Sequence, residues 1–389
     1  MNKFKKFLNV LIILTAVIFI AVCVDLLTNK TLNTSYDSLS TVDQGAISEI
    51  CDIDGLFDKR KGNDEVWDVK YNLNGTPCII MKKNGFIAGR AYAINLDFSK
   101  SLNAQRIEMP GRHSDIPVYR LAFCSPEGLL FRFSSDDIGN AEVKKNSVLA
   151  MKYTSNTVKY KGAGSLEETY VKNTFVTAAE SPDQPKAKVE AHFQMEEENI
   201  ALMGLQYRII DEMRTARSLK ELNELIAEYV KVRDYQADMY PEFERQAEEI
   251  ELVDGRKQYV FYKVSELTKH DITYFNKEKN DSITFFSAYH YLCTGRYNSE
   301  VSDFVDYMGY VYSGAALCEI MKEQGFCHDW EKRLDNSTNT DFVSPYTLYK
   351  EYCEKACGEY DKKTIDDIKR EYNYEQMISM ARALIKGNE

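Results

Sequence analysis

The sequence predicts an α+β protein with an N-terminal membrane anchor, an antiparallel β-rich domain that forms a sandwich or a barrel, and then a helical-bundle domain. Three observations predict it: an uncharged apolar stretch near the N-terminus, short alternating segments joined by Asn-Gly turns, and helical periodicity through the second half. Of the 389 residues, 44% are hydrophobic, which argues against a disordered chain. We divide the chain into a membrane anchor or signal segment (1–27), a stalk (28–63), a β-rich domain (64–180) and a helical domain (186–389).

Three lysines precede the apolar stretch 7–24, and Asp25 follows it. As a helix, this stretch extends about 27 Å, close to the roughly 30 Å hydrocarbon core of a bilayer. We favour an uncleaved anchor that contacts the membrane through residues 7–27. A cleaved signal peptide is the first alternative, although no clean A-x-A site follows. Lipid modification of Cys23 is the second, although Val22 is bulkier than the small residue usual at that position.

The positions of these charges predict the orientation of the chain. Lysines before the span and an acid after it place the N-terminus in the cytoplasm and the bulk of the chain outside it. The 49 basic and 60 acidic residues give a formal net charge of −11. A protein that binds the phosphate backbone needs a positive surface, so we expect no nucleic-acid partner.

The β-rich domain is predicted from period-two alternation of apolar residues. Asn74-Gly75 and Asn84-Gly85 suit tight hairpin turns because both central positions accept positive φ. A series of strands with short connections is typical of an antiparallel sandwich or barrel. The predicted strands are 66–73, 76–83, 86–98, 117–124, 129–134, 147–154, 157–162 and 166–178.

After the linker 181–185 the spacing of apolar residues becomes helical. Residues 189–210 carry one apolar face, and Ser218 with Glu221 forms a predicted capping box that begins the next helix. The segment 257–267 fits either a strand or a helix. The later helices are predicted at 281–293, 299–323 and 344–357, the first two ending before glycines and the third beginning with Ser-Pro.

Nine cysteines are present, and eight remain when Cys23 is assigned to the membrane. An even number outside the cytoplasm is compatible with disulfides. Two disulfides are predicted among the four cysteines of the C-terminal region; buried thiols and a zinc site are the alternatives, and the cysteine spacings match no zinc framework. We therefore predict no metal and no cofactor. The four disulfide candidates are Cys318, Cys327, Cys353 and Cys357.

No P-loop, H-E-x-x-H, G-x-S-x-G or C-x-x-C motif is present. Weak catalytic candidates are His328, Asp329 and Glu331, because a histidine oriented by a carboxylate is suited to acid–base chemistry. The alternative is a solvated loop around a buried tryptophan. His290 is a further candidate, although a histidine on an apolar helix is more often a core residue.

Arg112 and His113 are weak candidates for ligand binding. They lie in a polar loop between two predicted strands, and loops of this kind carry binding residues when a domain binds anything. A guanidinium such as that of Arg112 holds carboxylates or phosphates in a bidentate manner. A solvated turn is the alternative.

These features lead to two hypotheses on function. The first is a membrane-anchored extracytoplasmic binding or scaffold protein of the cell envelope, with a protein or glycan partner. The second is an anchored envelope hydrolase that uses His328, Asp329 and Glu331, or His290. The absence of a catalytic motif favours the first hypothesis.

Overall fold

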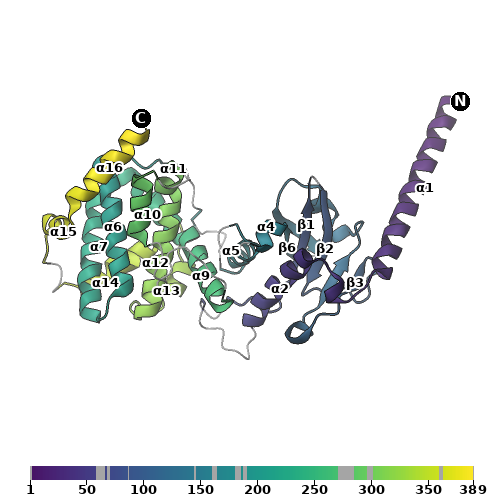
Figure 1. Ribbon diagram of the computed structural model, residues 1–389, viewed down its shortest axis with the longest axis horizontal. Helices are drawn as coiled ribbons and strands as arrows, with labels where there is room; N and C mark the ends of the chain where they lie inside the picture. The colour runs from purple at the N-terminus through teal and green to yellow at the C-terminus, as the bar shows by residue number, and fades with distance from the viewer. Residues whose placement is uncertain are drawn as a thin grey trace. The chain divides into compact units, whose positions relative to one another are not determined.

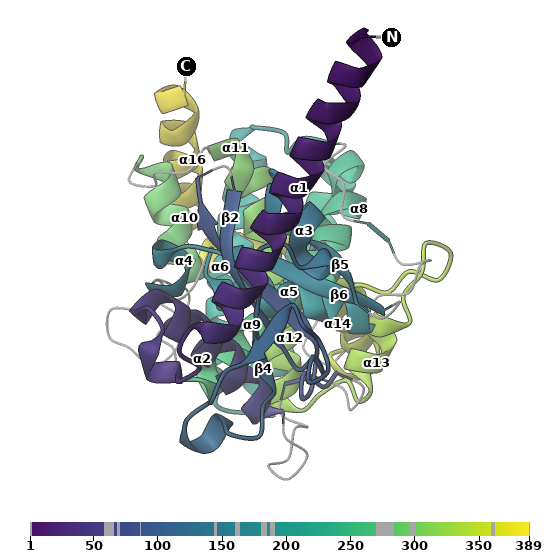
Figure 2. The same ribbon diagram turned by 90° about the vertical axis from the view of Figure 1, so that its right-hand side faces the viewer.

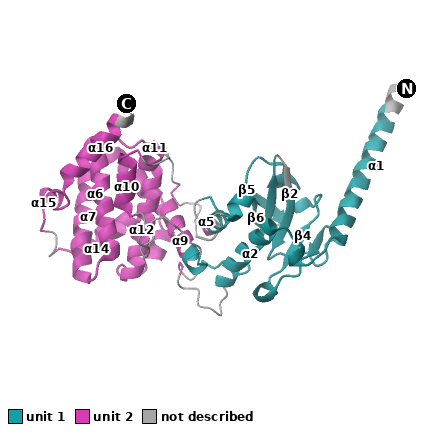
Figure 3. Ribbon diagram, viewed as in Figure 1, with its two compact units in different colours: residues 1–65, 71–174, 264–271 teal, residues 66–70, 175–263, 272–389 magenta. Residues whose placement is uncertain are grey.

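The computed structural model describes residues 2–57, 66–67, 71–85, 87–143, 146–159, 164–179, 185–186, 191–269, 284–295, 301–358 and 362–388. The chain divides into two compact units (Figure 3). Unit 1 comprises 1–65, 71–174 and 264–271, and unit 2 comprises 66–70, 175–263 and 272–389. The domain boundaries given above stay predictions. The segment expected to be a stalk belongs to unit 1, and 181–184 of the expected linker lie outside the described residues.

Unit 1 begins with the helix α1 (Asn2–Thr31), drawn at the N-terminus in Figure 1. Within the described residues, the 25-residue segment Phe7–Thr31 of α1 is the one helix long and apolar enough to cross a membrane. Its most apolar window is 0% buried. The apolar stretch of the sequence therefore forms a helix as predicted, and the helix continues past Asp25 without a break.

Six strands of unit 1 form one sheet in the order β3-β4-β2-β1-β6-β5. The central strands β1 and β6 are parallel, whereas the other neighbours are antiparallel. The predicted antiparallel sandwich or barrel is therefore wrong: the sheet is single, open and mixed. The strands are β1 (Cys78–Asn84), β2 (Ile87–Ile94), β3 (Ala104–Arg106), β4 (Val118–Leu121), β5 (Ile138–Val143) and β6 (Asn146–Tyr153).

Three of the predicted strands are helices: α3 (Pro126–Phe133), α4 (Ser155–Lys159) and α5 (Leu166–Ala179). In α3, Pro126 occupies the first turn after the N-cap Ser125, where the missing N–H costs nothing. In α5, Leu166, Tyr170 and Val171 are buried at helical rather than alternating spacing. The described part of the predicted strand 66–73 is also not a strand.

Each face of the sheet is covered by helices. One face packs Ile79, Met81 and Ala150 against Phe131 of α3. On the other face, the buried Asp43 of α2 (Thr41–Leu56) accepts hydrogen bonds from Tyr92 (3.2 Å) and Tyr153 (2.9 Å). The sheet is therefore a buried layer. The short 3₁₀ helices η1 (Tyr36–Ser38) and η3 (Gly111–His113) complete unit 1.

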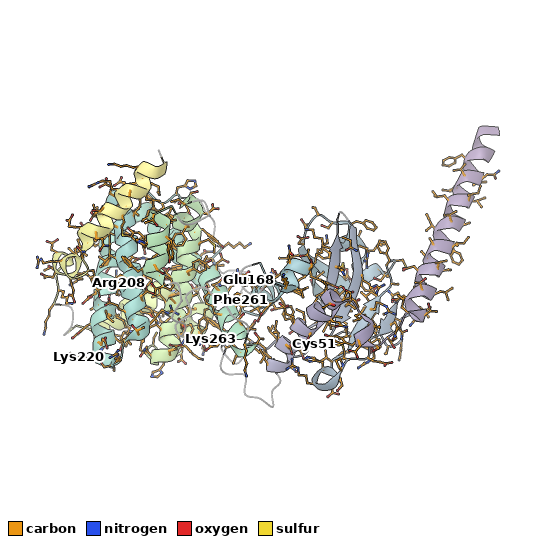
Figure 4. The ribbon with its side chains drawn as sticks, viewed as in Figure 1. Cys51, Glu168, Arg208, Lys220, Phe261 and Lys263 are labelled. Carbon is orange, nitrogen blue, oxygen red and sulfur yellow. The ribbon has the colours of Figure 1, made fainter. Side chains whose placement is uncertain are left out.

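The described elements of unit 2 are helical, and the ambiguous segment 257–267 is part of a helix whose residues 264–267 belong to unit 1. Ser218 caps its helix, accepting from the Glu221 N–H at 3.2 Å, but the predicted capping box is incomplete because the Glu221 carboxylate accepts the backbone N–H of Arg217 (2.8 Å) instead. Arg208 and Lys220 project from the exposed faces of the first two helices (Figure 4). The helices are α6 (Glu197–Thr215), α7 (Leu219–Met239), α8 (Pro241–Ile250), α9 (Arg256–Leu267), α10 (Phe285–Cys293), α11 (Val301–Asp303), α12 (Gly309–Gln324), α13 (Trp330–Asp335), α14 (Pro345–Ala356), α15 (Ile365–Glu371) and α16 (Tyr374–Asn388).

Two π-helical segments, η4 (Glu251–Gly255) and η5 (Phe304–Met308), interrupt these helices. The backbone of η4 lies against α12 at Gly255 and Gly314, and a methyl group on either glycine would collide with the opposing backbone. Segments of this kind are rare and often occur at functional sites. Here η4 also places the side chain of Glu251 inside the unit.

Arg233 of α7 lies fully buried between two carboxylates, at 2.9 Å from Glu244 and 2.8 Å from Glu251. Ser313 donates a further hydrogen bond to Glu251 (2.9 Å). The single positive charge of Arg233 faces the two carboxylates of Glu244 and Glu251. One of the two carboxyl groups therefore keeps its proton to a higher pH than an isolated carboxyl would. Burial is the largest cause that raises the pKa of Glu244, to about 7; the Glu251 and Glu248 charges add to the rise, and Arg233 opposes it.

We predict that this carboxyl makes the protein less stable as pH rises from about 4.5 to 7. The folded state holds the Glu244 proton across this interval and the unfolded state releases it, so stability is highest below the unfolded pKa. The full effect is on the order of 3 kcal/mol. Chemical denaturation of the full chain in detergent measures it. In Glu244→Gln the free energy of unfolding should no longer fall between these pH values, whereas in Glu249→Gln, on the same helix, it should fall as in the parent protein. Equal pH dependence in the two variants would contradict the assignment of the effect to Glu244.

Candidate functional site

The C-terminal end of α1 is bound to the sheet by the buried Arg120 of β4. The guanidinium donates to the side-chain oxygen of Asn29 (2.9 Å) and to the backbone carbonyls of Asn29 (2.7 Å), Leu32 (3.1 Å) and Asn33 (2.8 Å). Arg120 is only 1% exposed. One side chain therefore satisfies the end of α1 and the segment that follows it.

This geometry has an electrostatic reason. The last carbonyls of a helix have no partners within it, and they carry the negative end of the helix dipole. A planar guanidinium offers five N–H donors in a fixed arrangement. Burial lowers the pKa of Arg120, but arginine begins from so high a value that it remains charged. The charge is thus placed where the helix end is most negative.

Two further contacts hold the same part of α1 on unit 1. The Asp25 carboxylate accepts the backbone N–H of Cys124 (2.8 Å), and the Lys30 ammonium donates to the carbonyl of Ala104 (2.7 Å). Asp25 lies one helical turn before the residues that Arg120 contacts, and Lys30 lies next to Asn29. The end of α1 is therefore hydrogen-bonded to the rest of unit 1 at several points.

Arg112 and His113, the predicted binding residues, contact a side chain of this chain. Both side chains pair with the Asp52 carboxylate of α2, His113 at 3.1 Å. Burial would raise the pKa of Asp52, but the hydrogen bond and charge of His113, together with the charge of Arg112, hold it below its ordinary value. The predicted loop thus binds a carboxylate, and that carboxylate belongs to this chain.

The predicted catalytic residues after α12 line one cavity of about 260 Å³. His328 and Asp329 are exposed, and among the described residues no hydrogen bond joins their side chains. Glu331 pairs with Lys322 at 3.1 Å. Asp329 has a φ of 62°, a strained left-handed conformation for a residue with a side chain. The structure therefore brings these three residues together without an oriented acid–base pair.

His290 is separate from that group. It lies on α10 and does not line the cavity, and α10 and α13 occupy different ends of unit 2 in Figures 1 and 2. Its side chain is exposed, so the expectation of a core histidine is wrong. The buried positions of α10 are instead taken by Tyr289 and Leu292, which follow helical spacing.

The four disulfide candidates occupy different environments. Cys318 on α12 is a fully buried free thiol, and Cys327 is a partly buried one; burial raises the pKa of both. Cys357 is buried and Cys353 is partly exposed. The aromatic side chains of Phe326 and Tyr349 pack edge-on between these segments at 5.1 Å. The two disulfides stay a prediction.

A hollow of about 500 Å³ in unit 2 contains a pair that sequence reasoning missed. The imidazole Nδ1 of His192 lies 2.9 Å from the carboxylate of Asp306, which also accepts the backbone N–H of Phe193 at 2.7 Å. Asp306 is held in the π-helix η5, and Met195 and Val305 line the hollow. The partners are 114 positions apart, so no local motif could have identified them.

We predict that Arg120→Met detaches the end of α1 from the sheet. The variant loses four hydrogen bonds of a charged donor and leaves buried carbonyls without partners, a cost of about 2–4 kcal/mol. Hydrogen exchange of residues 25–36 in the full chain measures this, and their amides should exchange at least tenfold faster. Arg106→Gln on exposed β3 is the matched control. Unchanged exchange in Arg120→Met would show that other contacts hold the helix.

No family model matches the chain, and no curated protein or solved structure matches it either. Since a fold by itself does not determine function, the function has to be inferred from the sites of this chain.

Proposed function

We propose that this protein is a single-pass membrane protein of the cell envelope that binds or scaffolds a protein or glycan partner outside the cytoplasm. The uncovered apolar surface of α1 supports the membrane span. The three lysines before the span and Asp25 after it support a cytoplasmic N-terminus. Residues 7–27 are the part that contacts lipid.

The observation that carries the proposal is the attachment of α1 through Arg120. A tethered enzyme that searches for its substrate benefits from a flexible linker. A scaffold instead benefits from a fixed orientation, because binding then costs less ordering entropy. The hydrogen bonds of Arg120, Asp25 and Lys30 hold unit 1 in one orientation at the end of the anchor. This favours a protein that presents a surface at a set height above the membrane.

The hollow beside His192 is the binding site that we favour in unit 2. It combines an apolar lining from Met195 and Val305 with the polar pair of His192 and Asp306, whose side chains lie 2.9 Å apart. Concave sites that bind small ligands or peptide side chains have this composition: mostly apolar, with a few fixed polar groups. The tyrosines of the helical half contribute less, because Tyr310 and most of the others that the structure describes there are buried.

We predict that residues 28–389 are digested by protease added to intact cells, while an epitope tag placed before residue 3 stays protected. The lysines retained in the cytoplasm give this orientation. Immunoblotting for the tag and for the C-terminal region measures both ends. A C-terminal region that resists protease until the cells are lysed would reverse the proposed orientation, and a soluble cytoplasmic protein serves as the control for intact cells.

The second candidate function is an anchored envelope hydrolase, favoured by the cavity that collects His328, Asp329 and Glu331. For that function we predict that His328→Ala lowers hydrolysis of envelope polymers or peptides by about 10²-fold or more, the usual contribution of an acid–base residue. His290→Ala, on α10, tests the other candidate histidine in the same assay. Product release that is equal in the parent and in both variants would contradict a hydrolase that uses these histidines.

A further inference from the structure

Helix α3 presents apolar side chains to the outside of unit 1. Leu130 is 89% exposed and Phe133 is 55% exposed, and Leu129 is also exposed on the same helix. Phe123 and Ile138, on the segments before and after α3, extend the patch, and the rings of Phe123 and Phe133 meet edge-on at 6.1 Å. Single exposed apolar residues are common, whereas a contiguous group of them usually marks a contact surface.

The opposite side of α3 is fixed to the sheet, so the patch cannot turn inward. Phe131 packs in the core of unit 1. The buried Arg132 donates to the carbonyl of Gly89 and lies over the ring of Phe123 at 4.5 Å. Gly128 lies against the side chain of Met81, and a methyl group there would collide with it. The helix is therefore amphipathic, with its outward apolar side held in place.

The patch lies beside the end of the apolar segment of α1. Cys124, two residues before α3, donates its backbone N–H to Asp25, and the charge of Asp25 also acts on Arg132. Figure 2 draws α3 next to α1. Because the uncharged stretch 7–24 ends one residue before Asp25, these contacts place α3 at the level where a spanning α1 would leave the hydrocarbon.

We propose that the outward face of α3 inserts into the lipid bilayer beside the anchor, as a second and shallower membrane contact. The inference rests on the proposed span of α1. The occupant is lipid because the patch adjoins the part of α1 that lipid would surround, so the apolar surface is continuous from one to the other. Glu127 lies in the first turn of α3, and Asp136 and Asp137 follow the helix, so attraction to anionic headgroups is not the driving force. Burial of apolar side chains at the interface is sufficient.

Tryptophan reporters in the full chain test this. The protein is reconstituted into phosphatidylcholine vesicles with and without brominated acyl chains, which quench tryptophans within contact distance. Leu130→Trp tests α3, and Leu14→Trp reports on the span. Asn156→Trp is the matched control, on the exposed side of α4, which packs with α2 on the opposite face of the sheet. The unsubstituted protein supplies the background of Trp67 and Trp330, both buried.

We expect brominated lipid to quench the reporters at 14 and 130 by at least twofold, and the reporter at 156 by less than a tenth. Quenching at 14 without quenching at 130 would overturn the insertion of α3 and leave the anchor in place. No quenching at 14 would overturn the anchor and, with it, this inference. Equal quenching at 130 and 156 would also overturn it, because contact with lipid would then not be specific to α3.

Discussion

The structure of unit 1 depends on one constraint: a helix that ends against a sheet must have its last carbonyls hydrogen-bonded. Arg120 meets this constraint, and its position in β4 makes the sheet itself the partner of the helix end. A buried guanidinium is costly to desolvate unless every donor finds an acceptor. Because Asn29, Leu32 and Asn33 supply those acceptors, the arginine and the helix end each depend on the other. The orientation of α1 relative to the sheet follows from this contact.

Unit 2 is organised by a different constraint, the burial of charge. Arg233 and Glu251 lie fully inside the unit, and Glu244 pairs with the same arginine. The π-helix η4 allows Glu251 to reach this position while Gly255 packs against Gly314. Buried ionic groups contribute little net stability compared with apolar residues of equal size. The observed packing of α7, η4 and α12 satisfies them, because Arg233 and Ser313 both donate to Glu251.

The sequence predicted those elements that depend on the pattern of apolar residues within a short segment. Hydropathy identified α1, and alternation with Asn84-Gly85 identified the β1–β2 hairpin. It did not predict the parallel pairing of β1 with β6, because parallel partners are joined through distant segments and leave no turn signal. The segment 129–134 was misassigned because α3 has one turn of apolar residues facing outward, which masks the helical period.

The site residues were harder to predict for the same reason. Arg112 was a candidate for binding a carboxylate or phosphate ligand; the carboxylate that it contacts in the structure is Asp52 of the same chain, and ligand binding stays a prediction. The sequence did not identify Arg120 as important, because a charged residue within an apolar strand is also typical of a solvent-exposed position at the edge of a sheet. The pairing of His192 with Asp306 joins segments far apart in sequence. Each of these contacts is defined by tertiary packing, which composition and spacing do not contain.

The central claim is that α1 and the rest of unit 1 form one rigid body. The most direct measurement is the distance distribution between spin labels at positions 27 and 156, attached through a ketone-bearing amino acid so that the nine native cysteines are not labelled. Pulsed dipolar spectroscopy of the full chain in lipid nanodiscs should give one narrow distribution that is unchanged in detergent. A broad distribution, or one that shifts between the two environments, would show that the anchor moves freely on unit 1 and would contradict the account.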